Sequence, residues 1–206
     1  MSFELLLIGG GGHCRSCIDV IEQEGSFAVA GIIERPGAAG EDRLPGYPVL
    51  GTDDDLRGLR RKYFQALVTV GQIKSPKPRQ RLFEELLALE FELPVIVSPL
   101  AYVSPRARIG HGTIIMHQAL VNAGAEIGKN CIINSKALVE HGATISDHCH
   151  ISTGAIINGD SKIGAGTFIG SRAMIRESIE IAPDSFVAAG QNIYESLTAE
   201  NRAVSI

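Results

Sequence analysis

The sequence predicts a small α/β domain followed by an all-β domain, because the chain has two different rhythms. Before about residue 93, apolar runs typical of buried strands alternate with helical patterns, which indicates a Rossmann-like parallel sheet with helices on its faces. From Val97 to Val187, every sixth residue is Val or Ile. That period is typical of a parallel β-helix made of hexapeptide repeats. We therefore place the domains at 1–93 and 94–206.

Each element of the first domain has a local signal. The apolar run FELLLIG at 3–9 indicates a buried parallel strand, and it ends in the four glycines 9–12, which we expect to form a tight turn. Cys14, Cys17, Ile18 and Ile21 then recur at helical spacing, so we expect a helix over 14–25 that ends at Gly25. The same reasoning predicts strands at 27–33 and 64–71 and helices at 53–63 and 76–90.

The hexapeptide column of the second domain is unbroken. A triangular coil takes three hexapeptides, so its sixteen repeats make about five coils. At a coil spacing of roughly 4.8 Å, the prism is about 25 Å tall. The fifth residue of most repeats is small, and we expect the first and fifth positions to face the core. The column consists of Val97, Val103, Ile109, Ile115, Val121, Ile127, Ile133, Val139, Ile145, Ile151, Ile157, Ile163, Ile169, Ile175, Ile181 and Val187.

The repeat also predicts where several reactive side chains lie. His111, His117 and His141 are third in their repeats, so we expect them on the outer surface. Cys131 and Cys149 are both fifth and one coil apart, which predicts stacked thiols with Cα atoms about 5 Å apart. The pair Cys14 and Cys17 has redox or zinc spacing, but no second such pair completes a zinc site, so we interpret both as helix residues.

Composition excludes some classes of function. The formal net charge is −4 and no basic run is present, so we expect no nucleic-acid partner. No apolar run reaches the roughly 18 residues of a membrane span. The first residues do not read as a secretory signal. We therefore expect a cytoplasmic protein that does not insert into a membrane.

Two stretches add a family resemblance to the hexapeptide pattern. LLIGGGGHCRSCIDVIE at 6–22 and VEHGATI at 139–145, together with the repeats, resemble the left-handed β-helix acyltransferases. The more specific match is to the two-domain branch that contains sialic-acid O-acetyltransferases and UDP-4-amino-sugar N-acetyltransferases. The left-handedness of the β-helix is implied by this resemblance alone, since ordinary β-strand crossovers are right-handed.

The resemblance also implies roles for residues of the β-helix. It implies a homotrimer in which acetyl-CoA lies in a groove between the β-helices of neighbouring subunits. His141, which follows Glu140, matches the family's general base. A histidine titrates near neutral pH and is therefore suited to take a proton from an attacking group. The positions implied to contact acetyl-CoA are His150, Gly170, Ser171, Ala188, Ala189 and Gly190.

One position departs from the family pattern. An acid usually follows the catalytic histidine, but this chain has Gly142 there. Glu140, Asp147 or a backbone carbonyl is left as the group that orients the ring of His141, and the sequence does not choose among them.

In the first domain, the resemblance implies a nucleotide-sugar site. Glycines before a helix let a phosphate approach backbone amides, but the dinucleotide fingerprint fails because Cys14 occupies its last position. At the end of the second strand, the family has an acidic pair. Here Arg35 follows Glu34, which favours an acidic substrate. The positions that we expect to bind substrate are Gly11, Gly12, His13, Glu34, Arg35 and Gly71.

These observations predict an acetyl-CoA-dependent acetyltransferase, without a metal, that acts on the amino group of a nucleotide-linked sugar in surface-glycan synthesis. O-acetylation of a sialic- or legionaminic-type acid is the close alternative. A remote alternative is a carbonic-anhydrase-like zinc enzyme using three of His117, His141, His148 and His150, since catalytic zinc commonly takes three protein ligands. A non-catalytic binding module is a further reading.

Overall fold

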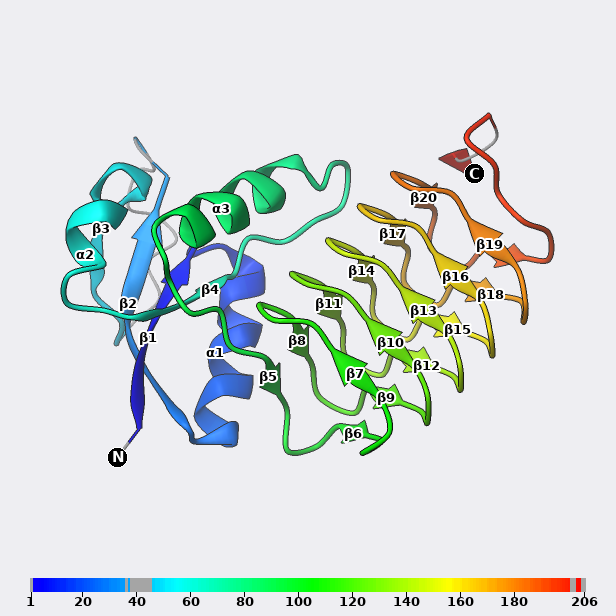
Figure 1. Cartoon of the computed structure of the whole chain (residues 1–206), viewed down its shortest axis with the longest axis horizontal. Coiled ribbons are helices and arrows are strands. Elements are labelled where there is room, and N and C mark those ends of the chain that lie inside the picture. The colour runs from blue at the N-terminus through cyan, green and yellow to red at the C-terminus, as the bar shows by residue number, and fades with distance from the viewer. Residues whose placement is uncertain (1, 36, 38–45, 201–202, 205–206) are drawn as a thin grey trace.

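The structure is a computed structural model that describes residues 2–35, 37, 46–200 and 203–204. A small α/β part and a long β-helix lie side by side (Figure 1), and helix α1 (Gly12–Glu24) lies between the sheet and the first coils. Within the described residues, no helix has the length and apolarity needed to cross a membrane.

The N-terminal sheet is parallel, with strand order β3-β2-β1-β4. Successive residues of its central strand face opposite sides. Leu5 and Leu7 pack with α1, whereas Leu6 and Ile8 pack with the other helices. The elements are β1 (Phe3–Ile8), β2 (Phe27–Glu34), β3 (Val49–Thr52), β4 (Gln65–Val68), a 3-10 turn η2 (Asp53–Asp55), α2 (Leu56–Leu59) and α3 (Lys77–Ala88).

Two elements differ from the prediction. Strand β3 was not expected, because it is a four-residue edge strand without an apolar run. The helix expected over 53–63 is shorter, since it consists of η2 and the single turn α2. A capping box between Thr52 and Asp55 starts this turn and fixes its position at the end of β3.

The β-helix has a two-residue strand in every hexapeptide, in phase with the predicted column. These strands form three parallel sheets. From β5 to β21 each residue pairs with the residue eighteen positions away, as Leu138 does with Ile156, whereas Val187 of β20 pairs with Val204 of β22, seventeen positions away. They are β5 (Ile96–Val97), β6 (Tyr102–Val103), β7 (Arg108–Ile109), β8 (Ile114–Ile115), β9 (Leu120–Val121), β10 (Glu126–Ile127), β11 (Ile132–Ile133), β12 (Leu138–Val139), β13 (Thr144–Ile145), β14 (His150–Ile151), β15 (Ile156–Ile157), β16 (Lys162–Ile163), β17 (Phe168–Ile169), β18 (Met174–Ile175), β19 (Glu180–Ile181), β20 (Phe186–Val187), β21 (Asn192–Ile193) and β22 (Ala203–Val204).

The corners of the coil share one backbone conformation. The fourth residue of each hexapeptide from Gly112 to Gly190 has a φ between 51° and 74°. Six of these residues are glycines, but Asn130, His148 and Asp160 adopt the same left-handed conformation. The corner therefore accepts either glycine or a polar residue. The thiols of Cys131 and Cys149 are free and buried one coil apart, as the pairing of the residues that follow them shows.

The three outer faces of the prism differ in chemistry. The cavity-side sheet (β5, β8, β11, β14, β17, β20 and β22) is covered by α1 over its first coils, where Ile96, Ile114 and Ile132 are buried. The charged sheet (β7, β10, β13, β16 and β19) shows ion pairs such as Lys162–Glu180 at 2.7 Å. The apolar sheet (β6, β9, β12, β15, β18 and β21) presents a paired ladder of Tyr102, Leu120, Leu138, Ile156 and Met174.

Histidines join the two parts of the molecule, which corrects the expectation for His111 and His117. His117 is half-buried and bridges Ser98 at 2.6 Å and Asp19 of α1 at 2.7 Å. His111 stacks on Phe83 of α3, with ring centroids 5.4 Å apart. The position within the repeat correctly turns these rings away from the β-helix core, but the N-terminal domain covers that outer surface.

Candidate active site

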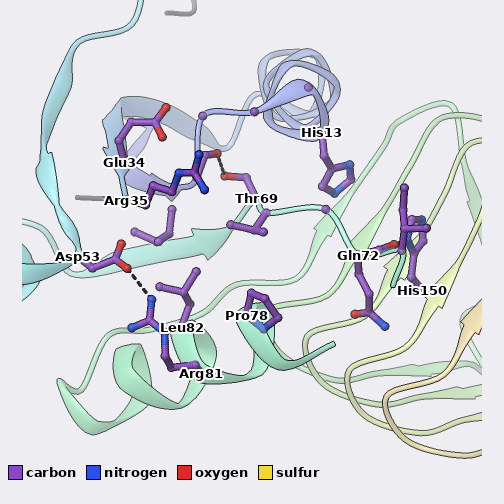
Figure 2. Close-up of a pocket in the computed structure, with 18 of the residues that line it drawn as sticks. His13, Glu34, Arg35, Asp53, Thr69, Gln72, Pro78, Arg81, Leu82 and His150 are labelled. Carbon is purple, nitrogen blue, oxygen red and sulfur yellow. Dashed lines mark hydrogen bonds and ion pairs between the residues drawn. The ribbon is translucent and has the colours of Figure 1, made fainter. Parts of the chain in front are cut away.

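A cavity of about 1640 Å³ lies where the carboxyl ends of the sheet strands meet the cavity-side sheet. Every residue predicted to bind substrate in the first domain lines it: Gly11, Gly12, His13, Glu34, Arg35 and Gly71. His150 and Ser171 reach the same cavity from the β-helix. Figure 2 shows His13 and His150 on one side of this space and Glu34, Arg35 and Asp53 on the other. The fold thus brings the six positions predicted to bind substrate and two of the positions implied for acetyl-CoA to one cavity.

The N-terminus of α1 opens onto this cavity. Gly11 is the N-cap and offers no side chain to cap the helix, and a Cβ added at Gly11 or Gly12 would meet nothing within 4 Å. Gly10 lies differently, because a Cβ there would stand 2.1 Å from the carboxylate of Glu34. Gly11 and Gly12 therefore leave the backbone amides at the N-terminus of α1 accessible, and Gly10 leaves room for the carboxylate of Glu34.

His150 is buried and has both ring nitrogens engaged. Nδ1 lies 2.6 Å from the backbone carbonyl of Gln72, and since a carbonyl only accepts, Nδ1 carries the proton. Nε2 then accepts from the side-chain amide of Asn134 at 3.1 Å. Burial lowers the pKa of His150 to about 4, and the charge of Arg79 adds to this. The ring is therefore neutral and fixed at neutral pH.

His13 lies beside His150, with ring centroids 6.4 Å apart. Burial is the main reason that the pKa of His13 is lowered to about 3, and Arg79 and His150 lower it further. Nε2 of His13 contacts the Cys17 thiol at 3.4 Å, one helical turn away. The two histidines therefore give this end of the cavity a neutral polar wall.

Arg79 holds this wall in place from behind. It is buried and donates to the carbonyls of Val68 and Val70 and to both oxygens of Asn130. Burial lowers its pKa to about 10, so the guanidinium remains charged at neutral pH. Arg79 thereby ties β4 and α3 to a corner of the β-helix, since its partners belong to both domains.

The opposite rim of the cavity carries charge. Arg81 of α3 pairs with Asp53 at 2.6 Å, and Glu34 and Arg35 stand at the end of β2 (Figure 2). Asp53, Arg81 and Thr69 were not among the predicted site residues. Asp53 had a signal, because it directly follows the carboxyl end of a parallel strand, but that strand was itself missed.

A second, apolar hollow of about 420 Å³ adjoins the cavity, and Ile73, Phe168 and Ser171 line both. Four positions that the resemblance implied for acetyl-CoA line it: Gly170, Ser171, Ala188 and Ala189. Phe168 and Phe186 stack with centroids 5.3 Å apart, and His150 meets Phe168 edge-on at 5.2 Å. These aromatic residues were missed, although they recur at eighteen-residue spacing from His150. Gly190 lines neither hollow.

His141 and Glu140 line neither hollow in the single chain. They lie at the corner between β12 and β13, on the other side of the apolar sheet from the cavity. His141 is exposed, and its ring lies across Gly159, where an added Cβ would stand 2.6 Å from Cε1. Glu140 turns its carboxylate to Asn122 at 2.9 Å and to the backbone amide of His141 at 3.1 Å.

Comparisons with known proteins agree with this architecture. A family model described as the PglD N-terminal domain matches residues 4–86, one described as bacterial transferase hexapeptide (six repeats) matches 106–140, and one described as the hexapeptide repeat of succinyl-transferase matches 162–194. No curated protein sequence matches the chain. The acetyltransferase domain of PglB from Neisseria gonorrhoeae is 30% identical, with 95% of this chain and 93% of that one covered and a TM-score of 0.87.

Two further solved structures are similar. PerB from Caulobacter crescentus in complex with CoA and GDP-perosamine is 28% identical, covers 98% of this chain and 92% of its own, and has a TM-score of 0.87. WeeI from Acinetobacter baumannii shares the fold. It is 16% identical, with 93% of this chain and 96% of that one covered and a TM-score of 0.62. The chain belongs to the left-handed β-helix hexapeptide acetyltransferases. Within them, it is similar to the PglB and PerB proteins that carry this N-terminal domain.

Proposed function

We propose that this protein transfers an acetyl group from acetyl-CoA to the amino group of a nucleotide-linked amino sugar. The observation that carries the proposal is the continuity of the two hollows. A polar cavity at a helix N-terminus joins an apolar hollow beside His150 and Phe168. One end suits a nucleotide diphosphate and the other a pantetheine arm, so the acceptor amine and the thioester meet between them.

The N-terminal end of the site suits a sugar nucleotide. The accessible amides at Gly11 and Gly12, with the positive end of the α1 dipole, favour a diphosphate. Glu34 at the end of β2 is placed to accept from a ribose or base. PerB, at 28% identity, is solved with CoA and GDP-perosamine, which supports this class of substrate.

The proposed base comes from a neighbouring subunit. The apolar sheet leaves Tyr102 55% exposed and Leu120 36% exposed in the single chain, and covering its ladder would bury this surface. Strand β12 of that sheet lies between a corner that lines the cavity, at Asn134, and the corner that carries His141. A threefold assembly that packs through it would bring His141 of one subunit toward the cavity of the next. The homotrimer is thus part of the proposal.

The chemistry follows from this arrangement. The neutral amine attacks the thioester carbonyl, and His141 takes the proton that the nitrogen loses. The tetrahedral intermediate collapses to the amide and the CoA thiolate, and the proton held by His141 passes to the thiolate, which regenerates the neutral imidazole. General base catalysis of this kind contributes roughly 10²–10⁴-fold. Because both nitrogens of His150 are engaged within the chain, we assign it the shaping of the thioester pocket rather than proton donation.

One observation favours a second candidate, the O-acetylation of a sugar acid such as a sialic- or legionaminic-type acid. Arg35 lines the cavity beside Glu34 and would pair with a carboxylate. For the zinc reading, the residues described contain no group of three His, Cys, Asp or Glu side chains placed to hold a metal ion.

The test is thiol release from acetyl-CoA with a panel of acceptors: UDP-4-amino sugars, GDP-perosamine, and sialic and legionaminic acids. The proposal expects turnover with a nucleotide-linked amino sugar and formation of an amide. Turnover restricted to a sugar acid would replace the substrate and keep the reaction. The absence of thiol release with every acceptor would contradict the acetyltransferase assignment for these substrates.

A further inference from the structure

The acids that the sequence offers beside His141 are engaged elsewhere. Glu140 accepts from Asn122 and from the backbone amide of His141, so its carboxylate is turned away from the ring. Asp147 belongs to another corner, where it accepts from the backbone amide of Lys129 at 2.8 Å. Neither acid is placed to orient the imidazole.

A third acid occupies the space that Gly142 leaves open. Asp160 lies one coil above Gly142, and its Oδ1 is 2.1 Å from the point where a Cβ on Gly142 would stand. The backbone amide of Asp160 donates to the carbonyl of His141 at 3.0 Å. The ring of His141 lies across Gly159, the residue before Asp160. The ring of His141 therefore lies against residue 159 and the carboxylate of Asp160 lies against residue 142, so that the two side chains lie at the same corner of adjacent coils.

The surroundings leave Asp160 available. Among the described residues, its carboxylate has no hydrogen-bond or ion-pair partner, and it is exposed. The coil below His141 has Asn122, Ala123 and Gly124 at this corner, and two coils above stand Arg176 and Glu177. At this corner, the coil of His141 has one acid, the engaged Glu140. In the coils directly below and above it (122–125 and 158–161), the acid present is Asp160.

We propose that Asp160 is the positioning residue for His141, supplying from the next coil the carboxylate that Gly142 lacks. It stabilises the protonated ring after proton transfer and holds the ring toward the acceptor. This rests on the proposed function of His141 as the base.

The chain offers a matched control. Asp184 covers Gly166 in the same way, with its Oδ1 2.4 Å from the position of a Cβ on that glycine. Asp160 and Asp184 have similar φ values, 57° and 54°. Asn tolerates this conformation well, so Asp160→Asn and Asp184→Asn remove one charge each with equal conformational consequences. Among the residues that the structure describes, this corner (164–167 and 182–185) has no histidine.

The primary experiment is a pH titration of the His141 ring by NMR in ¹³C-histidine-labelled protein, with His141→Ala to identify its signal. Because a carboxylate favours the protonated ring, Asp160→Asn is expected to move the midpoint to lower pH. Asp184→Asn is expected to leave it unchanged. The swap Gly142→Asp with Asp160→Gly is expected to restore it. An unmoved midpoint in Asp160→Asn, or an equal shift in Asp184→Asn, overturns the proposal.

The rate profile provides the second readout. In Asp160→Asn, kcat is expected to fall roughly fivefold with the KM for the sugar unchanged, and the acidic limb of kcat/KM is expected to follow the NMR midpoint. If His141→Ala keeps the wild-type rate, the base assignment of the proposed function fails. If His141→Ala is inactive and Asp160→Asn matches wild type, only the role of Asp160 fails.

Discussion

Two positions in one coil stack, on either side of the apolar sheet, have histidines in opposite situations. On the cavity side, His150 at the start of β14 is buried, is hydrogen-bonded at both nitrogens, and has its pKa lowered to about 4 by burial. On the other side, His141 is exposed and no side chain is bonded to its ring among the residues described. The difference indicates that the first ring builds the pocket and that the second is available to exchange protons.

The largest expected effect comes from the exposed corner. His141→Asn should lower kcat/KM by about 10²–10⁴-fold, because the amide cannot accept the proton of the attacking amine. Thiol release at saturating acetyl-CoA measures this. His148→Asn, which changes a half-buried histidine against Phe83 outside both hollows, should retain most activity. Equal losses in the two variants would contradict the division between the corners.

The apolar sheet between the corners provides the next test. Leu138→Lys should dissociate the proposed trimer and reduce activity about 100-fold at low protein concentration, because three lysines would be buried at the interface. Thr144→Lys, on the charged sheet of the same coil, should leave both the mass and the rate unchanged. Light scattering with parallel assays measures the result. A Leu138→Lys protein that stays trimeric would remove this sheet from the interface.

In the cavity, Gly11→Asp at the N-terminus of α1 should change the binding of the sugar nucleotide without lowering the stability of the fold. Asp is a better N-cap than glycine, so the free energy of unfolding should stay level or rise by a few tenths of a kcal/mol. Its carboxylate would stand where we place the diphosphate and raise the KM for the sugar nucleotide by about 10–100-fold. The neutral control, Gly11→Asn, should raise KM less. An unchanged KM in Gly11→Asp would move the phosphate site elsewhere.

The smallest effect concerns acid stability. Because the pKa of His150 is about 4 in the folded state against 6.5 ordinarily, the unfolded chain binds more protons between these values. Stability therefore falls as pH drops from about 6.5 to about 4, by roughly 3 kcal/mol from this residue. Urea unfolding of His150→Gln should show a shallower pH dependence than urea unfolding of wild type. Identical slopes in the two proteins would contradict the burial of His150.

The comparison also shows what the sequence could predict. The six-residue column predicted every strand from β5 to β20, because one spacing sets burial in all coils. It did not predict what lies outside a coil, so His111 and His117 were expected on the surface although α1 and α3 cover them. Strand β3 was missed because a short edge strand needs no apolar run. Asp160 was visible in principle, since adding eighteen to 142 leads to it, but the single-coil reading of the corner stopped at Asp147.

The most direct test of the central claim is subunit complementation. His141→Ala and Gly11→Asp proteins would be unfolded, mixed in equal amounts and refolded, and assayed at a sugar-nucleotide concentration below the wild-type KM, where each alone is expected to keep at most a few per cent of the wild-type rate. If the site combines the cavity of one subunit with His141 of the next, random threefold mixing restores about one quarter of wild-type activity. If the mixture stays inactive while light scattering shows mixed trimers, both corners act within one chain or His141 is not the base, and the account is contradicted.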